Sequence, residues 1–334
     1  MWKQVQKSRK TLLWCVALFT VSMVILVNVT SKCSLRANLT WMKYQIFGKQ
    51  RLTTEMTIKI HENMTIITAF WDLGSFRKGN GSLEYSAIDY MDWSSVFQRM
   101  VNPLVVYTDC LNFKMIMEKY RESFPNKTKV IIIERRKFWS FQIVNNISSV
   151  FEQPDYPNFY PNTVLPEYSA CQHTKFAVVA DALKRDIFRT EFYAWLDIGY
   201  FRDIVCDEHY FRLNPPPYID KGRLCMTKIN EFSSNISMES IFKENEVWVG
   251  GGMLVATKNI FLKFEKLYKR SVEFFLNLKI MNSDQQIIYG LYSKAGRKHL
   301  KPDVELQLFS PVDSQRVGTD NVWFYLGYLC REYV

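Results

Sequence analysis

A short aromatic run that ends in a carboxylate places the strongest constraint on the fold of this chain. The run Phe192–Leu196 is too short for a helix between its turn signals, so it predicts a buried β-strand. Asp197 follows directly, and we expect the chain to turn at Gly199. Because ligands of α/β sheets bind outside the carboxyl ends of strands, Asp197 is a candidate site residue. The alternative is that Asp197 only caps a turn, with Gly199 supplying a positive φ.

Apolar runs and segments with helical spacing alternate through the rest of the chain. The runs predict strands at 64–70, 104–108, 130–133, 224–228 and 247–257. Helical spacing is found at 94–100, 113–124 and 259–279, and it begins again near Ser169 and Asp284. This alternation predicts an α/β domain with a mostly parallel sheet flanked by helices.

Two further segments have features that are typical of binding sites. Gly250, Gly251 and Gly252 interrupt an apolar strand, which lets a ligand or another backbone approach closely. Residues 154–166 contain four prolines and predict a loop longer than a simple connector, and such loops are often functional. We expect the tyrosines of this region to stack on ligand rings. They are Tyr156, Tyr160 and Tyr168.

The amino-terminal segment has the pattern of a membrane anchor. Residues 11–29 form a stretch of 19 residues without a charge, which is long enough to cross a bilayer core. Lys and Arg concentrate before this stretch, so we expect a cytoplasmic amino terminus. A cleaved signal peptide is the alternative, but its apolar region is normally shorter and ends in a small-residue site. The expected regions are a cytoplasmic tail at 1–10, a transmembrane signal anchor at 11–29, a stalk at 30–60 and a lumenal domain at 61–334.

Glycosylation sequons agree with a lumenal domain. Seven N-x-S/T triplets lack a middle proline, and Asn28 lies too close to the membrane to be modified. The expected N-glycosylation sites are Asn38, Asn63, Asn80, Asn126, Asn146 and Asn235. The chain therefore predicts a single-pass type II membrane protein of the Golgi, with the plasma membrane as the alternative, since no retrieval signal ends it.

The cysteines of a lumenal domain lie in a compartment that permits disulfides. Cys206 and Cys225 flank one loop and are the expected bridge. Cys33 lies in the expected stalk and could join two chains into a disulfide-linked dimer. Buried free thiols are the alternative for all of them, and spacing does not decide between the two.

Charge and motifs exclude several classes of protein. The formal net charge is +10, four of it in the expected tail, and the remaining basic residues are spread among acidic ones. Such a surface suits anionic nucleotide or glycan ligands, and nucleic acid is not expected across a membrane. The chain has no P-loop, no G-x-S-x-G, no H-E-x-x-H and no zinc-spaced Cys/His cluster, which argues against a zinc or serine hydrolase. What remains is a site centred on carboxylates.

Four motifs carry a resemblance to a known family. They are Thr68-Ala-Phe-Trp-Asp-Leu-Gly74, Pro166-Glu-Tyr-Ser-Ala-Cys-Gln-His-Thr-Lys175, Trp195-Leu-Asp-Ile-Gly-Tyr-Phe-Arg-Asp203 and Trp248-Val-Gly-Gly-Gly-Met-Leu-Val-Ala-Thr257. With them the chain resembles the HtrL/YibB family over most of residues 61–334. The chain also has, in order, a strand, a Thr-Asp strand end, a Lys-bearing helix, a Leu-Asp-x-Gly strand end, a Gly-rich strand and an Asp-Gln helix. This order is similar to that of a lumenal GT-A glycosyltransferase, which implies a GT-A-like (nucleotide-diphospho-sugar transferase) fold.

The resemblance implies a role for each matching residue. The implied donor-binding residues are Thr68, Asp72, Asp109, Lys175, Asp197 and Gly199, and the implied acceptor-binding residues are Trp248, Gly250, Gly251 and Gly252. Asp284 is the candidate base of an inverting transfer, and Asp197 is the second catalytic candidate. The alternatives are a surface role for Lys175, a turn role for Asp109 and simple macrodipole stabilisation for Asp284.

The motif around Asp197 also bears on whether the protein needs a metal ion. Asp197 matches the first carboxylate of the glycosyltransferase D-x-D motif, which contacts the sugar nucleotide and its metal, and such sites bind Mn²⁺ or Mg²⁺. Gly199 stands in the place of the second carboxylate, which is usually a metal ligand, so metal dependence stays open. Two functions remain: an enzyme that moves a sugar from a nucleotide donor to a glycan acceptor, and an inactive glycan-binding or scaffold protein on the same fold.

Overall fold

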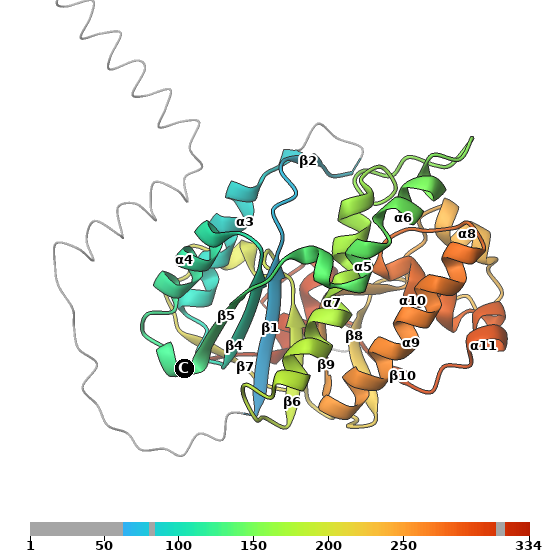
Figure 1. Ribbon diagram of the computed structural model, residues 1–334. Helices are drawn as coiled ribbons and strands as arrows, with labels where there is room; N and C mark the ends of the chain where they lie inside the picture. The colour runs from blue at the N-terminus through green and yellow to red at the C-terminus, as the bar shows by residue number, and fades with distance from the viewer. Residues whose placement is uncertain (1–62, 80–83, 312–317) are drawn as a thin grey trace, which may run out of the picture. The chain divides into compact units, whose positions relative to one another are not determined.

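A computed structural model describes residues 63–79, 84–311 and 318–334 (Figure 1). The expected tail, membrane span and stalk lie outside these ranges, as do Asn38, Asn80 and Cys33. Within the described ranges, no helix has both the length and the apolar character needed to span a bilayer. One unit holds the described residues up to Arg202 and from Glu208 onward.

The centre of this unit is a seven-stranded sheet in the order β10-β8-β9-β6-β1-β4-β5. Its strands are β1 (Met64–Phe70), β4 (Leu104–Thr108), β5 (Thr128–Ile132), β6 (Phe192–Leu196), β8 (Arg223–Lys228), β9 (Val249–Thr257) and β10 (Glu305–Phe309). Strand β9 runs antiparallel to both of its neighbours, and every other pairing is parallel. The predicted mixed α/β fold with a mostly parallel sheet is therefore confirmed.

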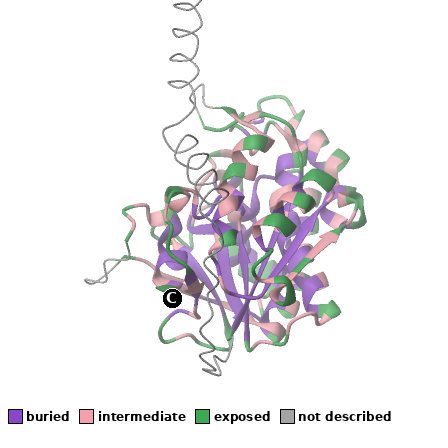
Figure 2. Ribbon diagram, turned by 90° about the vertical axis from the view of Figure 1, so that its left-hand side faces the viewer, coloured by how far each residue is buried: buried purple, intermediate pink, exposed green. Residues whose placement is uncertain are grey.

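Helices cover the sheet because its strands are apolar on both faces. In β1, six of the seven residues are buried, as expected for a parallel strand covered on two sides. Figure 2 shows the strands as buried and the outer sides of the helices as exposed. The longer helices are α4 (Leu111–Tyr120), α6 (Val144–Phe151), α7 (Pro166–Arg185), α9 (Lys258–Asn277) and α10 (Asp284–Tyr292). The shorter ones are α3 (Ala87–Trp93), α5 (Trp139–Gln142), α8 (Met238–Lys243), α11 (Lys294–Leu300) and α12 (Tyr325–Cys330).

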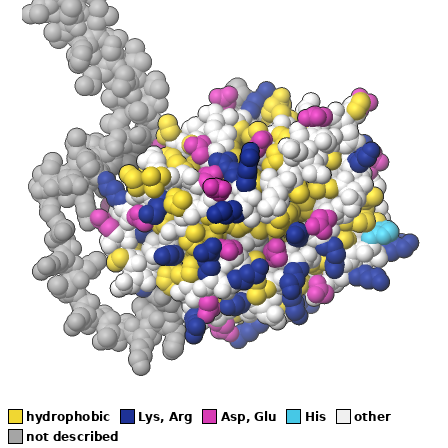
Figure 3. All heavy atoms as spheres, in the orientation of Figure 1, with side chains coloured by type: hydrophobic (Ala, Val, Ile, Leu, Met, Phe, Trp, Pro, Cys, Tyr) yellow, Lys and Arg dark blue, Asp and Glu magenta, His cyan; other side chains and the backbone are white. Residues whose placement is uncertain are grey.

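Two apolar layers result, one on each face of the sheet. On one face α7 packs against β1 and α9, and α9 packs against β8 and β9. Phe176 of α7 and Tyr268 of α9 meet there with ring centroids 3.9 Å apart. On the other side α4 packs against β4 and β5, and Phe113 stacks on Phe70 at 4.3 Å. Basic and acidic side chains are interspersed over the face that Figure 3 shows.

The chain crosses over between β1 and β6. Strands β4 and β5 extend the sheet on one side of β1, and the chain then returns through α7 to add β6 on the other side. In open α/β sheets such a reversal of strand order opens a crevice at the carboxyl ends of the two strands, where ligands bind. Phe70 and Leu196 end the two strands here, so the crevice is expected beside Trp71 and Asp197.

Some predicted elements differ from those observed. Residues 94–98 form a 3₁₀ helix, η1 (Ser94–Gln98), that continues α3, where we expected an α-helix over 94–100. The Ser94 hydroxyl donates to the Met91 carbonyl at 2.6 Å, a local bond that competes with regular helix geometry. The short strands β2 (Phe76–Arg77), β3 (Glu84–Tyr85), β7 (Phe211–Leu213) and β11 (Arg331–Tyr333) were not expected, and neither was β10.

The predicted disulfide between Cys206 and Cys225 is wrong. Cys206 is disulfide-bonded, but Cys225 is a buried free thiol on β8 whose sulfur lies 3.6 Å from the Gln307 side chain. Burial raises the pKa of the Cys225 thiol to about 12, so it is unreactive. The remaining cysteines that the structure describes, Cys110, Cys171 and Cys330, are also free. Flanking one loop in sequence did not bring the two thiols together.

We expect Arg121→Ala to destabilise the domain by about 3 kcal/mol or more, because it leaves buried carbonyls without their charged donor. Arg121 is 1% exposed and donates to the carbonyls of Phe97 and Asn102 at 2.9 and 2.8 Å. Chemical denaturation measures the loss. The control is Lys114→Ala, which removes a partly exposed ion pair of α4 and should cost below about 0.5 kcal/mol. Equal stability of the two variants would contradict this account.

Candidate functional site

A cavity of about 570 Å³ opens at the carboxyl ends of β1 and β6, where the change of strand order predicts one. It is lined by Trp71 after β1, Asp197 after β6 and Gly251 of β9. Lys175 of α7 and Asp284 of α10 reach the same cavity from the helical layer. The structure therefore brings together candidates that lie 109 positions apart in the sequence.

Asp197 is the carboxylate that a ligand can reach. Its side chain is 40% exposed, and it lines the cavity. The indole Nε1 of Trp195 donates to Oδ1 at 2.7 Å, and the backbone N–H of Asp197 donates to the Gly252 carbonyl at 2.8 Å. These contacts fix the carboxylate at the end of β6 and leave Oδ2 without a hydrogen bond from a described residue.

Lys175 and Asp284 form a buried ion pair beside it. Both side chains are 2% exposed, and Lys175 Nζ lies 2.9 Å from Asp284 Oδ2 and 3.6 Å from Asp197 Oδ1. The ammonium also donates to the Gly251 carbonyl at 2.9 Å. Three oxygens thus surround the buried ammonium, which is the number of protons that it carries.

The titration behaviour follows from this arrangement. Burial alone would lower the pKa of Lys175, but the carboxylates of Asp197 and Asp284 outweigh it and raise the pKa, so the ammonium stays charged. The surrounding walls of the cavity desolvate Asp197 and raise its pKa, although part of the side chain stays accessible; Lys175 opposes this, and the nearby Asp284 carboxylate adds to it. Asp197 is therefore a better proton acceptor than an exposed aspartate.

Gly251 makes the ion pair possible. A β-carbon at this position would lie 1.9 Å from Asp284 Oδ2 and 3.2 Å from Lys175 Nζ. Gly252 has a similar role, because its β-carbon would lie 2.9 Å from the Tyr200 ring. The glycines that were expected to admit a ligand thus admit side chains of the protein itself, although Gly251 and Gly252 also line the cavity.

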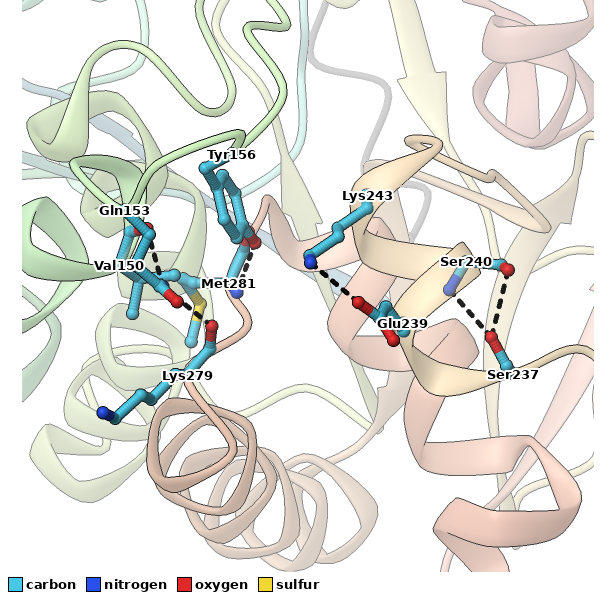
Figure 4. Close-up of polar contacts among 9 residues, drawn as sticks. All are labelled: Val150, Gln153, Tyr156, Ser237, Glu239, Ser240, Lys243, Lys279 and Met281. Atoms are coloured by element: carbon cyan, nitrogen blue, oxygen red, sulfur yellow. Dashed lines mark hydrogen bonds and ion pairs between the residues drawn. The ribbon is translucent and has the colours of Figure 1, made fainter.

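The loop that precedes α7 holds the start of α10 in place (Figure 4). The Tyr156 hydroxyl donates to the Met281 carbonyl and accepts from the Met281 N–H at 2.8 Å. Gln153 donates to the Lys279 carbonyl at 3.0 Å. Since Asp284 begins α10 three residues after Met281, these bonds position its carboxylate. Tyr156 is buried in this role and does not line the cavity.

Twelve aromatic side chains line the cavity, and sequence reasoning found only part of them. Tyr160 and Tyr168 of the predicted group line it. The others are Phe70, Trp71, Phe76, Tyr85, Tyr90, Trp93, Trp195, Tyr200, Trp323 and Phe324. The segment around α3 could have been found from its capping box, in which Ser86 and Asp89 bond each other's backbone N–H. Trp323 and Phe324 gave no such signal.

Two cations at the cavity also escaped sequence reasoning. Lys78 and Arg202 line it, and neither forms an ion pair with a carboxylate of the described residues. The Arg202 guanidinium lies over the rings of Phe324 and Trp93, 4.6 and 5.6 Å from their centroids. It also donates to the Gly199 carbonyl at 3.3 Å.

Several predicted site residues lie outside the cavity wall. Thr68 is buried and donates to the Leu196 carbonyl at 2.6 Å, which links β1 to β6. Asp72 accepts from the Gly74 N–H at 2.9 Å. Asp109 pairs with Arg135 beside a separate hollow of about 780 Å³.

Two of the acceptor candidates also lie outside the cavity wall. Trp248 packs on Phe232 with ring centroids 4.4 Å apart. Gly250 faces Ile229.

The residues around Asp197 do not fit a divalent cation. Within the described ranges, no three His, Cys, Asp or Glu side chains gather where they could hold a metal ion. Gly199 has no room for the second carboxylate of a D-x-D motif, because a β-carbon there would lie 2.7 Å from the Trp93 ring. Lys175 already occupies one side of Asp197.

The predicted glycosylation sites that the structure describes are all exposed at the surface. They are Asn63, Asn126, Asn146 and Asn235. None lines the cavity, so a glycan on any of them would leave the cavity walls unchanged.

Comparison with known proteins places the chain in a family. The family model HtrL_YibB, described as a bacterial protein of unknown function, matches residues 62–297. The chain belongs to the HtrL/YibB family. It is also 25% identical to Protein HtrL of Escherichia coli (strain K12) over 245 residues, which cover 69% of this chain and 84% of that protein. The match contains all the HtrL/YibB motifs recognised in the sequence, from Thr68 to Thr257.

We expect Gly251→Ala to destabilise this HtrL/YibB protein by about 3 kcal/mol, because the new methyl group overlaps the Asp284 carboxylate and separates it from Lys175. Gly250→Ala on the same strand is the control. Its methyl group would come closest to the flexible end of Ile229, at 3.3 Å, and should cost below about 1 kcal/mol. Denaturant midpoints at neutral pH compare the two, and equal midpoints would refute the packing argument.

His173 predicts an acid-dependent loss of stability. It is 0% exposed, lies 2.7 Å from the Tyr268 hydroxyl, and has its pKa lowered by burial from 6.5 to about 3. Below pH 6.5 the unfolded chain takes up this proton and the folded chain does not, so stability falls as the pH drops towards 3. The slope from this group is about 1.4 kcal/mol per pH unit.

The measurement is the free energy of unfolding between pH 6.5 and 4. His173→Gln should show a shallower acid slope than the unmodified protein, because its side chain takes up no proton in the unfolded state. The control is His299→Gln, which alters an exposed histidine of α11. A slope that His173→Gln leaves unchanged would show that the histidine is not responsible.

Proposed function

We propose that this protein is a glycosyltransferase that moves a sugar from a nucleotide-sugar donor to a glycan acceptor. The observation that carries the proposal is the position of Asp197. It is an accessible carboxylate at the carboxyl end of β6, beside the reversal of strand order, in a cavity of about 570 Å³. Nucleotides bind at this position in open α/β sheets, and the volume lies within the range of small-molecule sites.

The walls of the cavity support a nucleotide sugar as the ligand. Nucleobases and sugar rings both present flat or apolar faces, which stack on aromatic side chains. Trp71 and Tyr168 lie on the side of the cavity near β1 and α7, and Trp323 and Phe324 come from the carboxy-terminal part of the chain. The three parallel strands β1, β4 and β5 support a GT-A-like nucleotide-binding half.

The two carboxylates divide the work in the proposed reaction. The acceptor hydroxyl forms a bond to the anomeric carbon, the bond to the nucleoside diphosphate breaks, and the diphosphate leaves with the bonding electrons. Asp197 faces the cavity and has its pKa raised, so we assign it the position beside the reacting sugar, where it accepts the hydroxyl proton. Asp284 is buried against Lys175, and we assign it the positioning of that lysine.

The cellular setting of the proposal rests on the sequence. A type II anchor over residues 11–29 would place the enzyme in the lumen of the Golgi, or at the plasma membrane, as a glycoprotein. An inactive glycan-binding protein on the same fold is the competing function. The observation that favours it is Gly199, which takes the place of a carboxylate of the D-x-D motif.

We expect the full-length protein, purified in detergent, to hydrolyse at least one member of a panel of nucleotide sugars. Asp197→Asn should lower this rate about 100-fold or more, because the amide accepts no proton. The variant should still be stabilised thermally by uridine or guanosine diphosphate. Asp303→Asn, which changes an exposed aspartate, is the matched control.

The outcomes separate the two functions. Hydrolysis that is lost in Asp197→Asn and retained in Asp303→Asn supports the transferase. Binding of free glycans without stabilisation by any nucleotide supports the inactive protein. Hydrolysis at an unchanged rate in Asp197→Asn contradicts the role of this carboxylate.

A further inference from the structure

We propose that Lys78 and Arg202 form a cationic clamp that binds the diphosphate of the donor and takes the place of a divalent cation. The inference rests on the proposed function for the identity of the ligand. It predicts that nucleoside diphosphates bind without metal and that their affinity depends on these two side chains.

The proposed ligand is strongly anionic. A diphosphate carries several negative charges, and burying it among aromatic walls is costly unless cations pair with it. In the described part of the chain, the cavity offers three cationic side chains: Lys78, Lys175 and Arg202. Lys175 already pairs with Asp284 and contacts Asp197, so its charge is neutralised within the protein.

Lys78 and Arg202, unlike Lys175, have no carboxylate of the described residues in an ion pair with them. Burial within the walls of the cavity lowers the pKa of Lys78, and repulsion from Arg202 lowers it further, while the Asp197 carboxylate opposes both without forming an ion pair. The Lys78 side chain is still in contact with solvent. An anion between the two groups would relieve this repulsion.

Both cations contact aromatic side chains of the cavity wall before a ligand arrives. The Arg202 guanidinium contacts the rings of Trp93 and Phe324 and donates to the Gly199 carbonyl. Lys78 lies 5.7 Å from the centroid of the Tyr85 ring. The next residue, Gly79, donates its N–H to the Tyr160 carbonyl at 2.8 Å. Planar guanidinium groups and flexible ammonium groups are both common partners of phosphate.

Gly199 stands where the D-x-D motif has its second carboxylate. The backbone at Gly199 is covered by Trp93, so no side chain there can hold a metal ion. The Gly199 carbonyl accepts a hydrogen bond from the Arg202 guanidinium instead. The place where the D-x-D motif would bring a metal ligand is therefore the place where this chain brings a guanidinium.

The test is calorimetric binding to the full-length protein in detergent, in the presence of excess EDTA. The probes are uridine and guanosine diphosphate, with the matching nucleosides for comparison. Lys78→Gln and Arg202→Gln should each raise the Kd of the diphosphate about 10-fold to 100-fold and leave the Kd of the nucleoside unchanged. Added Mn²⁺ should not tighten binding, and added salt should weaken it.

Two further variants keep the test decisive. Lys243→Gln is the control, because Lys243 of α8 pairs with Glu239 (Figure 4) and neither residue lines the cavity. Arg202→Lys keeps the charge if loss of the stacked side chain disturbs folding, and it should recover part of the affinity. Lys78→Gln changes an exposed side chain and tests the clamp on its own.

Each outcome bears on one proposal or the other. Binding that requires Mn²⁺ and ignores Lys78→Gln overturns the clamp and leaves the transferase standing. Diphosphate binding that depends on both cations, without hydrolysis of any donor sugar, supports the clamp and contradicts the transferase. No binding of either diphosphate under any condition overturns the clamp, and together with no hydrolysis of any donor sugar it overturns the transferase as well.

Discussion

The buried pair of Lys175 and Asp284 is the interaction on which the site depends. Removing an ammonium and a carboxylate from water is costly, and the cost is offset only when every proton finds an acceptor. Lys175 meets this requirement with Asp284, the Gly251 carbonyl and Asp197. These groups belong to α7, α10, β9 and the end of β6, so the pair fixes the relative positions of four elements beside the cavity.

This pair also explains why the two aspartates of the site differ. Asp284 is enclosed by protein, with its charge balanced by a lysine at 2.9 Å. Asp197 shares the same lysine at 3.6 Å, accepts from Trp195 and keeps 40% of its side chain accessible. One residue type thus serves two purposes, because the environment separates a carboxylate that supports the site from one that can meet a ligand.

The sequence predicted the parts of the fold whose pattern is local. Runs such as Met64–Phe70 and Phe192–Leu196 contain their own strand signal, and both strands have the predicted bounds. The sequence also identified Lys175, Asp197 and Asp284 as candidates that prove to be neighbours. The role of Gly251 was not predictable, because the side chain that it accommodates lies on a helix 33 residues further along the chain.

The walls of the cavity could not be predicted for a related reason. Trp93 and Phe324 are ordinary aromatic residues in a chain that is 15% aromatic, and only the fold brings both of them into contact with Arg202. A cation without a carboxylate partner is likewise invisible in a sequence where acidic and basic residues are mixed. Arg202 follows Gly199 by three residues and bonds its carbonyl, so the departure from the D-x-D pattern and the nearby guanidinium belong to one local structure. In that structure the loss of a carboxylate and the gain of a cation act in the same direction, since both make the cavity more favourable for an anion.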